Sequence, residues 1–332
     1  MNAWLFLCRP GFEADLAAEL AASPGGYGKA PENSGVVHWQ LPSPLTELPL
    51  FARSGFGVLD GFSNLPESDR VAALCHQLSG HQAGHLYLEH ADTNDGRAMQ
   101  RFLRGFRRPL ELGLRQARVL VENNSRVLHL FFESSTTGWL GFSDVSLTPW
   151  ENGIPRLRLP RAAPSRSALK IEEAWWRLMT EGERARWLRS GMQAADLGAA
   201  PGGWSWQLAC RGMRVTAVDH GRLAASLEDE YPVTHVSADA FTWQPAARLD
   251  WVVCDIVDKP ARTLSLMEKW LQQGWARAAV FNLKLPMKRR HREVASLLGR
   301  LRGALPEHRI RASQLYHDRE EITVLVLPGS DA

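Results

Sequence analysis

The second half of the chain alternates apolar strands with amphipathic helices, and no other feature of the sequence restricts the fold as strongly. The pattern predicts strands over residues 193–200, 214–220, 234–239, 249–256, 276–285 and 321–328. It predicts intervening helices over residues 202–212, 223–230, 264–274 and 291–305. Apolar strands joined by crossover helices are typical of a mostly parallel sheet with both faces covered. Ligands of such sheets bind beyond the carboxyl ends of the strands, so we expect functional residues there.

The first half of the chain predicts a different organisation. Shorter strands and helices alternate less regularly over residues 3–144, which indicates one or two small α+β units. A proline-containing segment, residues 147–167, separates these units from the regular βα region. The chain has 332 residues, of which 45% are apolar and 23% charged, so it is long enough for two globular domains.

Composition argues against several other classes of protein. No apolar run approaches the roughly 18 residues of a membrane-spanning helix, and the N-terminal sequence lacks the basic leader of a signal peptide. We therefore expect a cytoplasmic protein, and a monomer because no coiled-coil pattern is present.

The four cysteines are widely scattered, which disfavours a disulfide framework or a cysteine-rich zinc site. His81 and His85 have i, i+4 spacing, but a glycine between them and strand-like alternation after them favour no metal site.

A glycine-rich turn follows the first strand of the regular region. In "ADLGAAPGGWSW", Asp196 ends the strand, and the glycines of residues 198–203 allow a tight turn and a close approach of a ligand to the backbone. Asp219 and Asp239 end the next two strands, where carboxylates can bind a ribose diol or reach an adenine. The spacing differs from the GxGxxG of nicotinamide-dependent enzymes, and Pro201 offers no amide N–H to a phosphate. The turn therefore favours S-adenosylmethionine, whose binding requires no phosphate contact, over NAD.

Four ionisable residues lie where the functional edge of the sheet is expected. Lys170 is near the start of a helix, Asp255 and Lys284 end strands, and Glu321 begins the last strand. Each alone has an ordinary structural explanation, such as an exposed helix lysine or a lysine that extends to solvent. Together they place two lysines and two carboxylates around one pocket. Lys284 is unusual because leucines flank it and because only six of the 39 basic residues are lysines.

Five short motifs of the second half resemble one enzyme family. "SRSALK", "DLGAAPGGWS", "DWVVCDI", "FNLKLP" and "REEITV" resemble the K-D-K-E ribose 2′-O-methyltransferases of the FtsJ/RrmJ type over residues 165–328. The longer pattern, with "APSRSALKIEEAW", "CDIVDKPAR", "NLKLPMKRR" and "LYHDREEITV", is more similar still to the RlmM (YgdE) family of 23S rRNA cytidine 2′-O-methyltransferases. The resemblance implies a Rossmann-like S-adenosylmethionine-dependent domain with a mostly parallel seven-stranded sheet. It also implies an α+β RNA-binding region of the THUMP type before it.

The resemblance further implies a division of the chain into domains. A ferredoxin-like segment is expected over residues 1–50, a THUMP-type RNA-binding domain over 51–150, a linker over 151–165 and the methyltransferase domain over 166–332. The implied substrate is 23S rRNA, before the ribosome is fully assembled, and no membrane is involved.

Site residues are implied in the same way. Lys284 corresponds to the general base for the ribose 2′-hydroxyl, Lys170 and Asp255 to its positioning partners, and Glu321 to the fourth member of the tetrad. Glu320 competes with Glu321, and we prefer Glu321 because it directly precedes the apolar run. The positions that match cofactor contacts are Ser167, Ala200, Pro201, Gly202, Gly203, Asp219, Asp239 and Asp255.

A second surface is suggested by residues 97–126, which contain eight arginines against Glu111 and Glu122. Arginine suits phosphate contacts, so this segment is a candidate RNA-binding surface. A solvated helix face in an arginine-rich chain explains this cluster of arginines equally well.

The alternatives to the main prediction are a 2′-O-methyltransferase of another RNA, a non-catalytic RNA-binding assembly factor and, more distantly, an oxidoreductase.

Overall fold

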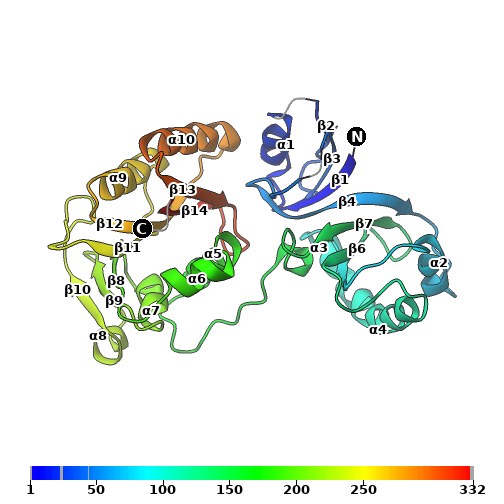
Figure 1. Cartoon of the computed structure of the whole chain (residues 1–332), viewed down its shortest axis with the longest axis horizontal. Helices are drawn as coiled ribbons and strands as arrows, with labels where there is room; N and C mark the ends of the chain where they lie inside the picture. The colour runs from blue at the N-terminus through cyan, green and yellow to red at the C-terminus, as the bar shows by residue number, and fades with distance from the viewer. Residues whose placement is uncertain (1, 23–24, 44, 330–332) are drawn as a thin grey trace. The chain divides into compact units, whose positions relative to one another are not determined.

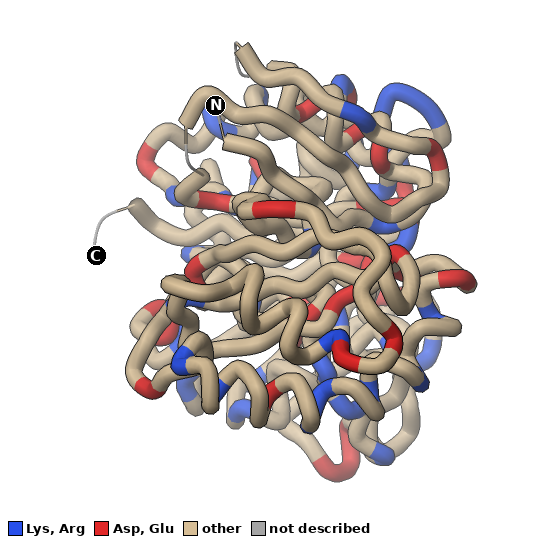
Figure 2. The backbone as a smooth tube through the Cα atoms, turned by 90° about the vertical axis from the view of Figure 1, so that its right-hand side faces the viewer, with Lys and Arg blue, Asp and Glu red and all other residues tan. Residues whose placement is uncertain are grey.

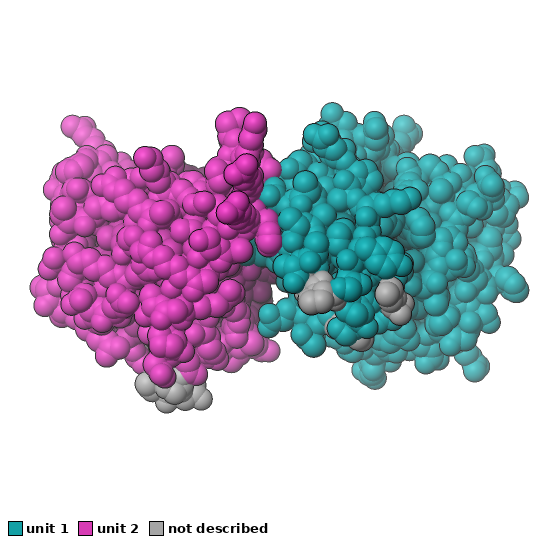
Figure 3. Space-filling model, turned by 90° about the horizontal axis from the view of Figure 1, so that it is seen from above, with its two compact units in different colours: residues 1–155 teal, residues 156–332 magenta. Residues whose placement is uncertain are grey.

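A computed structural model of the chain describes residues 2–22, 25–43 and 45–329 (Figure 1). The chain forms two compact units, residues 1–155 and 156–332, which Figure 3 shows in separate colours. Each unit has its own sheet and its own hydrophobic core.

Within its described residues, the first unit forms one sheet of seven strands in the order β2-β3-β1-β4-β7-β6-β5. The strands are β1 (Asn2–Cys8), β2 (Tyr27–Lys29), β3 (Val36–Leu41), β4 (Ala52–Phe62), β5 (His85–Glu89), β6 (Arg126–Phe132) and β7 (Gly138–Asp144). The long strand β4 pairs with β1 through its first half and with β7 through its second half, so the sheet is continuous. Gly55 allows close packing here, because an added Cβ would lie 2.5 Å from Cδ1 of Phe6 on β1.

Helix α4 covers part of this sheet with an amphipathic surface. The helices of the unit are α1 (Glu13–Ala21), α2 (Arg70–Gln77), α3 (Asn94–Ala98), α4 (Gln100–Gln116) and the short 3₁₀ helix η1 (Glu151–Gly153). Leu103, Leu110 and Leu114 of α4 are buried in a cluster with Leu74 of α2 and Leu130 of β6. This spacing places the apolar side chains on one face of the helix. The exposed face carries Arg101, Arg104, Arg108 and Arg115.

A buried polar cluster ties three strands of the first unit together. Nδ1 of His129 on β6 lies 2.7 Å from Oε2 of Glu89 on β5, and its Nε2 lies 2.7 Å from Oγ of Ser143 on β7. The imidazole also stacks on the ring of Phe56, with 4.7 Å between ring centroids. A carboxylate, an imidazole and a hydroxyl in this order resemble a hydrolytic triad. However, Glu89 and His129 are completely buried, so no substrate can reach the imidazole and we assign the cluster a structural role.

Within its described residues, the second unit also forms a seven-stranded sheet, in the order β10-β9-β8-β11-β12-β14-β13. The strands are β8 (Gln193–Leu197), β9 (Arg214–Val218), β10 (Val233–Val236), β11 (Leu249–Cys254), β12 (Ala276–Lys284), β13 (His308–Ser313) and β14 (Glu321–Pro328). The strands from β10 to β12 pair in parallel, and β14 pairs antiparallel with both β12 and β13. The predicted mostly parallel seven-stranded sheet is therefore confirmed.

Helices cover both faces of this second sheet (Figure 1). One face carries α5 (Ala168–Leu178), α6 (Glu181–Trp187) and α7 (Gly203–Ala209), and the other carries α9 (Pro260–Gln272) and α10 (Arg290–Ala304), while α8 (Ser226–Glu230) lies beside β10. Large tryptophans fill the core; for example, the buried indole of Trp251 donates a 2.7 Å hydrogen bond to the carbonyl of Trp187. No helix in the described part of the chain is both long and apolar enough to cross a membrane.

Candidate active site

The residues predicted to bind a cofactor follow neighbouring strands of the second sheet. Gly198 follows β8, Asp219 follows β9, Asp255 follows β11, and Asp239 lies three residues after β10. Because β8 to β11 run parallel, these positions share the carboxyl edge of the sheet. Strand β8 pairs with β9 on one side and β11 on the other, which makes this edge the topological switch point where such sheets bind ligands.

The glycine turn brings Ser167 against the start of α7. Gly202 has φ +107°, a conformation that favours glycine. A Cβ added to Gly203 would lie 2.3 Å from Oγ of Ser167. The indole of Trp204 donates a 3.0 Å hydrogen bond to the carbonyl of Ser167, which holds the two segments together. The start of α7 and Ser167 therefore lie side by side, and a side chain at position 203 would displace the hydroxyls of Ser165 and Ser167.

Asp219 organises the same turn through backbone hydrogen bonds. Its Oδ2 accepts from the N–H of Ala200 at 3.0 Å, and its Oδ1 accepts from the N–H of Gly221 at 2.7 Å. A carboxylate oxygen can accept more than one hydrogen bond, so the half-exposed Asp219 retains capacity for ligand hydroxyls. Asp239 is exposed, and its Oδ1 accepts from the N–H of Phe241 at 2.9 Å.

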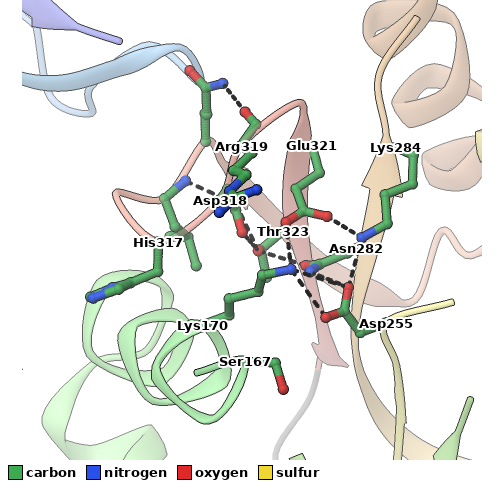
Figure 4. A network of polar contacts seen from close by, with 12 residues as sticks. Ser167, Lys170, Asp255, Asn282, Lys284, His317, Asp318, Arg319, Glu321 and Thr323 are labelled. Carbon is green, nitrogen blue, oxygen red and sulfur yellow. Dashed lines mark hydrogen bonds and ion pairs between the residues drawn. The ribbon is translucent and has the colours of Figure 1, made fainter. Parts of the chain in front are cut away.

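The structure brings Lys170, Asp255, Lys284 and Glu321 into one network (Figure 4). Lys284 and Glu321 are cross-strand partners on β12 and β14, and their side chains form an ion pair. Lys284 Nζ also donates to Oδ1 of Asp255 at 2.8 Å. Lys170, from the first turn of α5, lies 3.1 Å from Oδ2 of Asp255 and 2.5 Å from Oε1 of Glu321. Each lysine therefore contacts both carboxylates.

The charges in this network balance. Burial alone lowers the pKa of Lys170, but the carboxylates of Asp255 and Glu321 outweigh burial and raise that pKa above its ordinary value. Burial alone raises the pKa of Asp255, but Lys170 and Lys284 hold it below its ordinary value. The two ammonium groups and two carboxylates sum to a formal charge of zero, which limits the cost of placing charges in a partly buried site.

Glu320 and Glu321 have different surroundings. Glu320 is largely exposed and forms an ion pair with Arg290 at 2.8 Å. Glu321 is buried and faces the two lysines. The structure thus places Glu321 inside the network and Glu320 outside it.

Three buried polar residues next to the network were not singled out in the sequence. Nδ2 of Asn282 donates to Oδ1 of Asp255 at 2.8 Å, and Oδ1 of Asn282 accepts from the hydroxyl of Thr323 at 2.8 Å. Asp318 contacts Thr323 from the loop before β14. Asn282 lies two residues before Lys284, so both side chains share one face of β12. The asparagine inside this otherwise apolar strand is the sequence signal that points to a buried polar cluster.

Asp196 has a role different from that of the other strand-end acids. It is fully buried, and its Oδ2 accepts a 2.7 Å hydrogen bond from the hydroxyl of Ser205 on α7. Burial is the largest influence and raises the pKa of Asp196 to about 7. The carboxyl group therefore ties α7 to β8 beneath the glycine turn.

Comparisons with known proteins place the chain among methyltransferases. The family model of the RlmM ferredoxin-like domain matches residues 1–50, the model of ribosomal RNA large subunit methyltransferase M, N-terminal, matches residues 69–144, and the FtsJ-like methyltransferase model matches residues 163–286. A protein named Ribosomal RNA large subunit methyltransferase M from Alkalilimnicola ehrlichii is 48% identical and aligns over 97% of this chain and 93% of its own length. The proteins of the same name from Pseudomonas entomophila and Salmonella paratyphi B are 44% and 43% identical and align over 97% and 96% of their own lengths.

Among solved structures, TrmN from Thermus thermophilus aligns over 99% of both chains at 15% identity. Its TM-score of 0.35 is too low to support a conclusion about function.

The first prediction concerns the pH dependence of stability. The pKa of Asp196 is about 7 in the folded protein and about 3.9 in an unfolded chain. Between these values the folded state binds more protons, so the contribution of Asp196 to the free energy of unfolding falls as pH rises from about 4 to about 7. Asp196→Asn removes this titration. We expect its Tm relative to wild type to be higher at about pH 8 than at about pH 5.

Thermal unfolding without added cofactor measures this difference. Asp229→Asn, at an exposed position in α8, is the matched control and should give the same Tm difference at both pH values. An Asp196→Asn difference that does not change with pH would contradict the titration of this carboxyl.

Proposed function

The chain belongs to the ribosomal RNA large subunit methyltransferase M family, and from its site we propose that it methylates the ribose 2′-hydroxyl of a cytidine in 23S rRNA. Its cofactor is S-adenosylmethionine. The observation that carries the proposal is the network of two lysines and two carboxylates at the switch point of an FtsJ-like domain. We further propose that the protein acts in the cytoplasm, as a monomer, on rRNA that is not yet packed into a complete ribosome.

The residues at the switch point fit this cofactor. We propose that Ser167, residues 200–203, Asp219, Asp239 and Asp255 hold it. The glycine turn lets a ligand approach the backbone, Asp219 has capacity for ribose hydroxyls, and Pro201 offers no N–H to a phosphate. When bound, S-adenosylmethionine supplies a methyl group on a positively charged sulfur.

Lys284 is the proposed general base. Its Nζ would take the proton of the 2′-hydroxyl, and the oxygen would receive the methyl group that the cofactor would supply. The four side chains alone are formally neutral, so a sulfonium beside them leaves the site with one excess positive charge. This excess favours the loss of a proton from one lysine. Lys284 matches the general base in the family motif, so we assign it to accept the substrate proton. Lys170, which pairs with the same two carboxylates, is assigned to stay charged.

The other members of the tetrad position the base. Asp255 holds Lys284 through Oδ1 and Lys170 through Oδ2, and Glu321 holds each lysine through a separate oxygen. These contacts fix Nζ of Lys284 in one place at the strand end. Alignment of the hydroxyl oxygen, the methyl carbon and the sulfur then supplies most of the remaining catalysis.

Transfer of labelled methyl groups to 23S rRNA, followed by mapping of the modified nucleotide, tests the proposal. A methylated cytidine ribose in 23S rRNA supports it. Modification of another RNA would favour a related 2′-O-methyltransferase, and RNA binding without transfer would favour a non-catalytic assembly factor.

We propose that the first unit binds RNA. In domain terms, residues 1–50 would form a ferredoxin-like segment and 51–150 a THUMP-type domain, joined by a linker over 151–165 to a catalytic domain over 166–332. Figure 2 shows basic and acidic residues interspersed along the backbone, so overall charge does not identify the surface. The exposed arginines of α4 are a more specific candidate for the RNA-binding surface, because they lie on one face of the helix. We call this set (Arg101, Arg104, Arg108 and Arg115) the α4 arginine stripe.

Arg107 lies outside the stripe. It forms ion pairs with Glu111 at 3.6 Å and with Glu151, and it donates to the carbonyl of Leu86 at 3.4 Å. Replacing Arg107 would therefore disturb the contact between α4 and η1, and the stripe is the sharper place to test RNA binding.

Lys284→Arg is predicted to abolish methyl transfer while cofactor binding survives. Arginine keeps the positive charge but does not deprotonate at accessible pH. We expect the rate of methyl transfer to fall by about 10²–10⁴-fold, the usual contribution of a general base. Radiolabel transfer and calorimetric titration of the cofactor measure the two quantities. Lys269→Arg, on an exposed position of α9, is the control and should keep its activity; wild-type-like turnover of Lys284→Arg would exclude Lys284 as the base.

Charge reversal of the α4 arginine stripe is predicted to weaken RNA binding. Each lost phosphate contact lowers the salt dependence, so the double variant Arg104→Glu/Arg108→Glu should bind more weakly, with a slope of log K against log salt shallower by about 2. Fluorescence anisotropy over a salt series measures both. The control is Arg248→Glu/Arg302→Glu, which makes the same charge change at exposed positions of the second unit, before β11 and near the end of α10. If the stripe variant and this control have the same RNA affinity and the same salt slope, the α4 arginine stripe is not an RNA-binding surface.

A further inference from the structure

Beneath the tetrad lies a chain of buried polar side chains that runs from Asp318 to Asp255 (Figure 4). Asn282 and Thr323 are cross-strand partners on β12 and β14, two residues before Lys284 and two after Glu321. The hydroxyl of Thr323 lies 2.8 Å from Oδ1 of Asn282 and 3.0 Å from Oδ2 of Asp318. Asn282, Thr323 and Asp318 are completely buried, so a mismatch of donors and acceptors here would be costly.

Assigning each donor and acceptor between Asp255 and Asp318 leaves one favourable arrangement of protons. Asp255 is a carboxylate and only accepts, so the amide nitrogen of Asn282 must face it, at 2.8 Å. The amide oxygen of Asn282 then faces Thr323 and must accept from its hydroxyl. A hydroxyl has a single proton, so Thr323 has none left for Asp318. Oδ2 of Asp318 accepts from the N–H of Leu315 at 3.0 Å, and Oδ1 of Asp318 lies 3.2 Å from the hydroxyl of Thr323. The contact through Oδ1 is attractive only if Oδ1 carries a proton and donates it.

The alternatives each bring two acceptors together. If Thr323 donated to an ionised Asp318, its lone pair would face the Asn282 oxygen at 2.8 Å. If Asn282 were turned over, its oxygen would face the Asp255 carboxylate at 2.8 Å. Either clash of acceptors is unfavourable in a site without solvent.

We propose that Asp318 is a neutral carboxylic acid that starts a one-way hydrogen-bond chain, from Asp318 to Thr323 to Asn282 to Asp255, and that this chain positions the tetrad carboxylate. The chain holds Oδ1 of Asp255 toward Lys284, which leaves Oδ2 toward Lys170. It therefore acts on the base through Asp255. Asn282, Thr323 and Asp318 are positioning residues, and their role in turnover rests on the proposed function.

The surroundings of Asp318 agree with a neutral acid. Burial is the largest influence and, together with the nearby Glu321 and Glu173, raises the pKa of Asp318 well above its ordinary value, against the opposing effect of Lys170 and of the N–H of Leu315. A neutral Asp318 also leaves the tetrad balanced. An ionised one would add a negative charge beside it and would favour the ammonium form of the base.

Substitutions at Thr323 test the chain. Thr323→Val keeps the shape but removes the hydroxyl, so Asp255 loses its fixed orientation. We expect kcat to fall at least about tenfold, equivalent to about 1.4 kcal/mol, with little change in KM for RNA or cofactor and with a shifted pH profile of kcat. Thr323→Ser should restore most of the loss. A Thr323→Val enzyme with a lower Tm but wild-type kcat and pH profile would overturn the positioning role.

Substitutions at Asp318 test its proton. The amide of Asp318→Asn can donate to Thr323 and accept from Leu315, as a protonated acid does, whereas Asp318→Leu cannot. We expect Asp318→Leu to lose at least about tenfold in kcat and Asp318→Asn to recover most of it. Equal losses in both variants would overturn the proposal.

An infrared measurement is independent of turnover. At about pH 8, above the pKa of about 7 of Asp196, protein with ¹³C-labelled aspartate should show a protonated carboxyl band that Asp318→Asn loses. Absence of this difference would show that Asp318 is ionised and would overturn the proposal. If the wild type has the band but transfers no methyl group, the proposed function fails and the protonation of Asp318 stands.

A separate observation concerns the surface beside the tetrad. Met287 and Val257 are 91% and 86% exposed, more than the other exposed large apolar side chains in the described part of the chain. Val257 lies two residues after Asp255, and Met287 lies three residues after Lys284. They follow the parallel neighbours β11 and β12, so both segments leave the carboxyl edge of the sheet. Both side chains therefore belong to segments that leave the sheet at the edge that carries the tetrad, where they are accessible to a substrate.

The charge around these two residues fits a nucleic acid. Lys259 follows Val257, and Lys288 and Arg289 follow Met287; all three are exposed. Unpaired nucleotides pack their bases on flat or apolar side chains while their phosphates meet basic groups. We infer that Met287 and Val257 contact the nucleotide that presents the reactive hydroxyl, and that the adjacent basic residues hold its flanking phosphates. This inference rests on the proposed RNA substrate.

Removal of the apolar contact should weaken RNA binding without affecting the cofactor. For Val257→Ser/Met287→Ser we expect Kd for a 23S rRNA fragment to rise about tenfold, or about 1.4 kcal/mol, with unchanged cofactor affinity. Leu159→Ser, at an exposed residue of the segment before α5, is the control. Fluorescence anisotropy separates the outcomes: a wild type that binds no RNA refutes the proposed function, and a double variant that binds as tightly as wild type refutes this contact alone.

Discussion

The pairing of β14 with β12 is the constraint on which the site depends. Strand β14 runs against its neighbour in an otherwise largely parallel sheet, and this reversal brings its first residue, Glu321, opposite the last residue of β12, Lys284. A parallel strand would begin at the far edge of the sheet and would carry its first residue away from the cofactor side. The same register sets Asn282 opposite Thr323 one step deeper, so a single pairing builds both the ion pair and the support below it.

The sequence predicts much of this arrangement because its signals lie at element ends. Asp255, Lys284 and Glu321 interrupt or border apolar runs, and the carboxyl edge of a parallel sheet is a known place for function. The predicted apolar strands of the second unit are present. Strand β13 was not predicted, because "HRIRAS" alternates basic side chains with only short apolar ones, and it forms an edge strand with half-exposed side chains. The apolar residues of the segment 118–123 are typical of a strand, but the segment forms only an isolated bridge between Leu120 and Ala83.

Other features depend on packing that no local pattern encodes. Strand β4 contains three glycines, which weaken a strand. At one of them, Gly55, the absence of a side chain allows Phe6 of β1 to pack closely. The polar chain from Asp318 to Asp255 joins the loop before β14, the strands β14 and β12, and the residue after β11. Its proposed role depends on which atoms donate. A buried asparagine signals that partners exist, but the direction of each hydrogen bond follows only from the assembled atoms. That is why the tetrad could be found in the sequence and its support could not.

The balance of charge explains why lysine occurs here in a chain that otherwise uses arginine. Two carboxylates opposite two lysines make the resting site neutral, and a neutral Asp318 keeps it so. The sulfonium then adds one positive charge, which the site can release only through a group that deprotonates at accessible pH. Arginine would form the same ion pairs, with a better fit to carboxylates, and would keep the excess charge. The proposed role of position 284 therefore requires a group that can lose a proton between two acids, and lysine can do so.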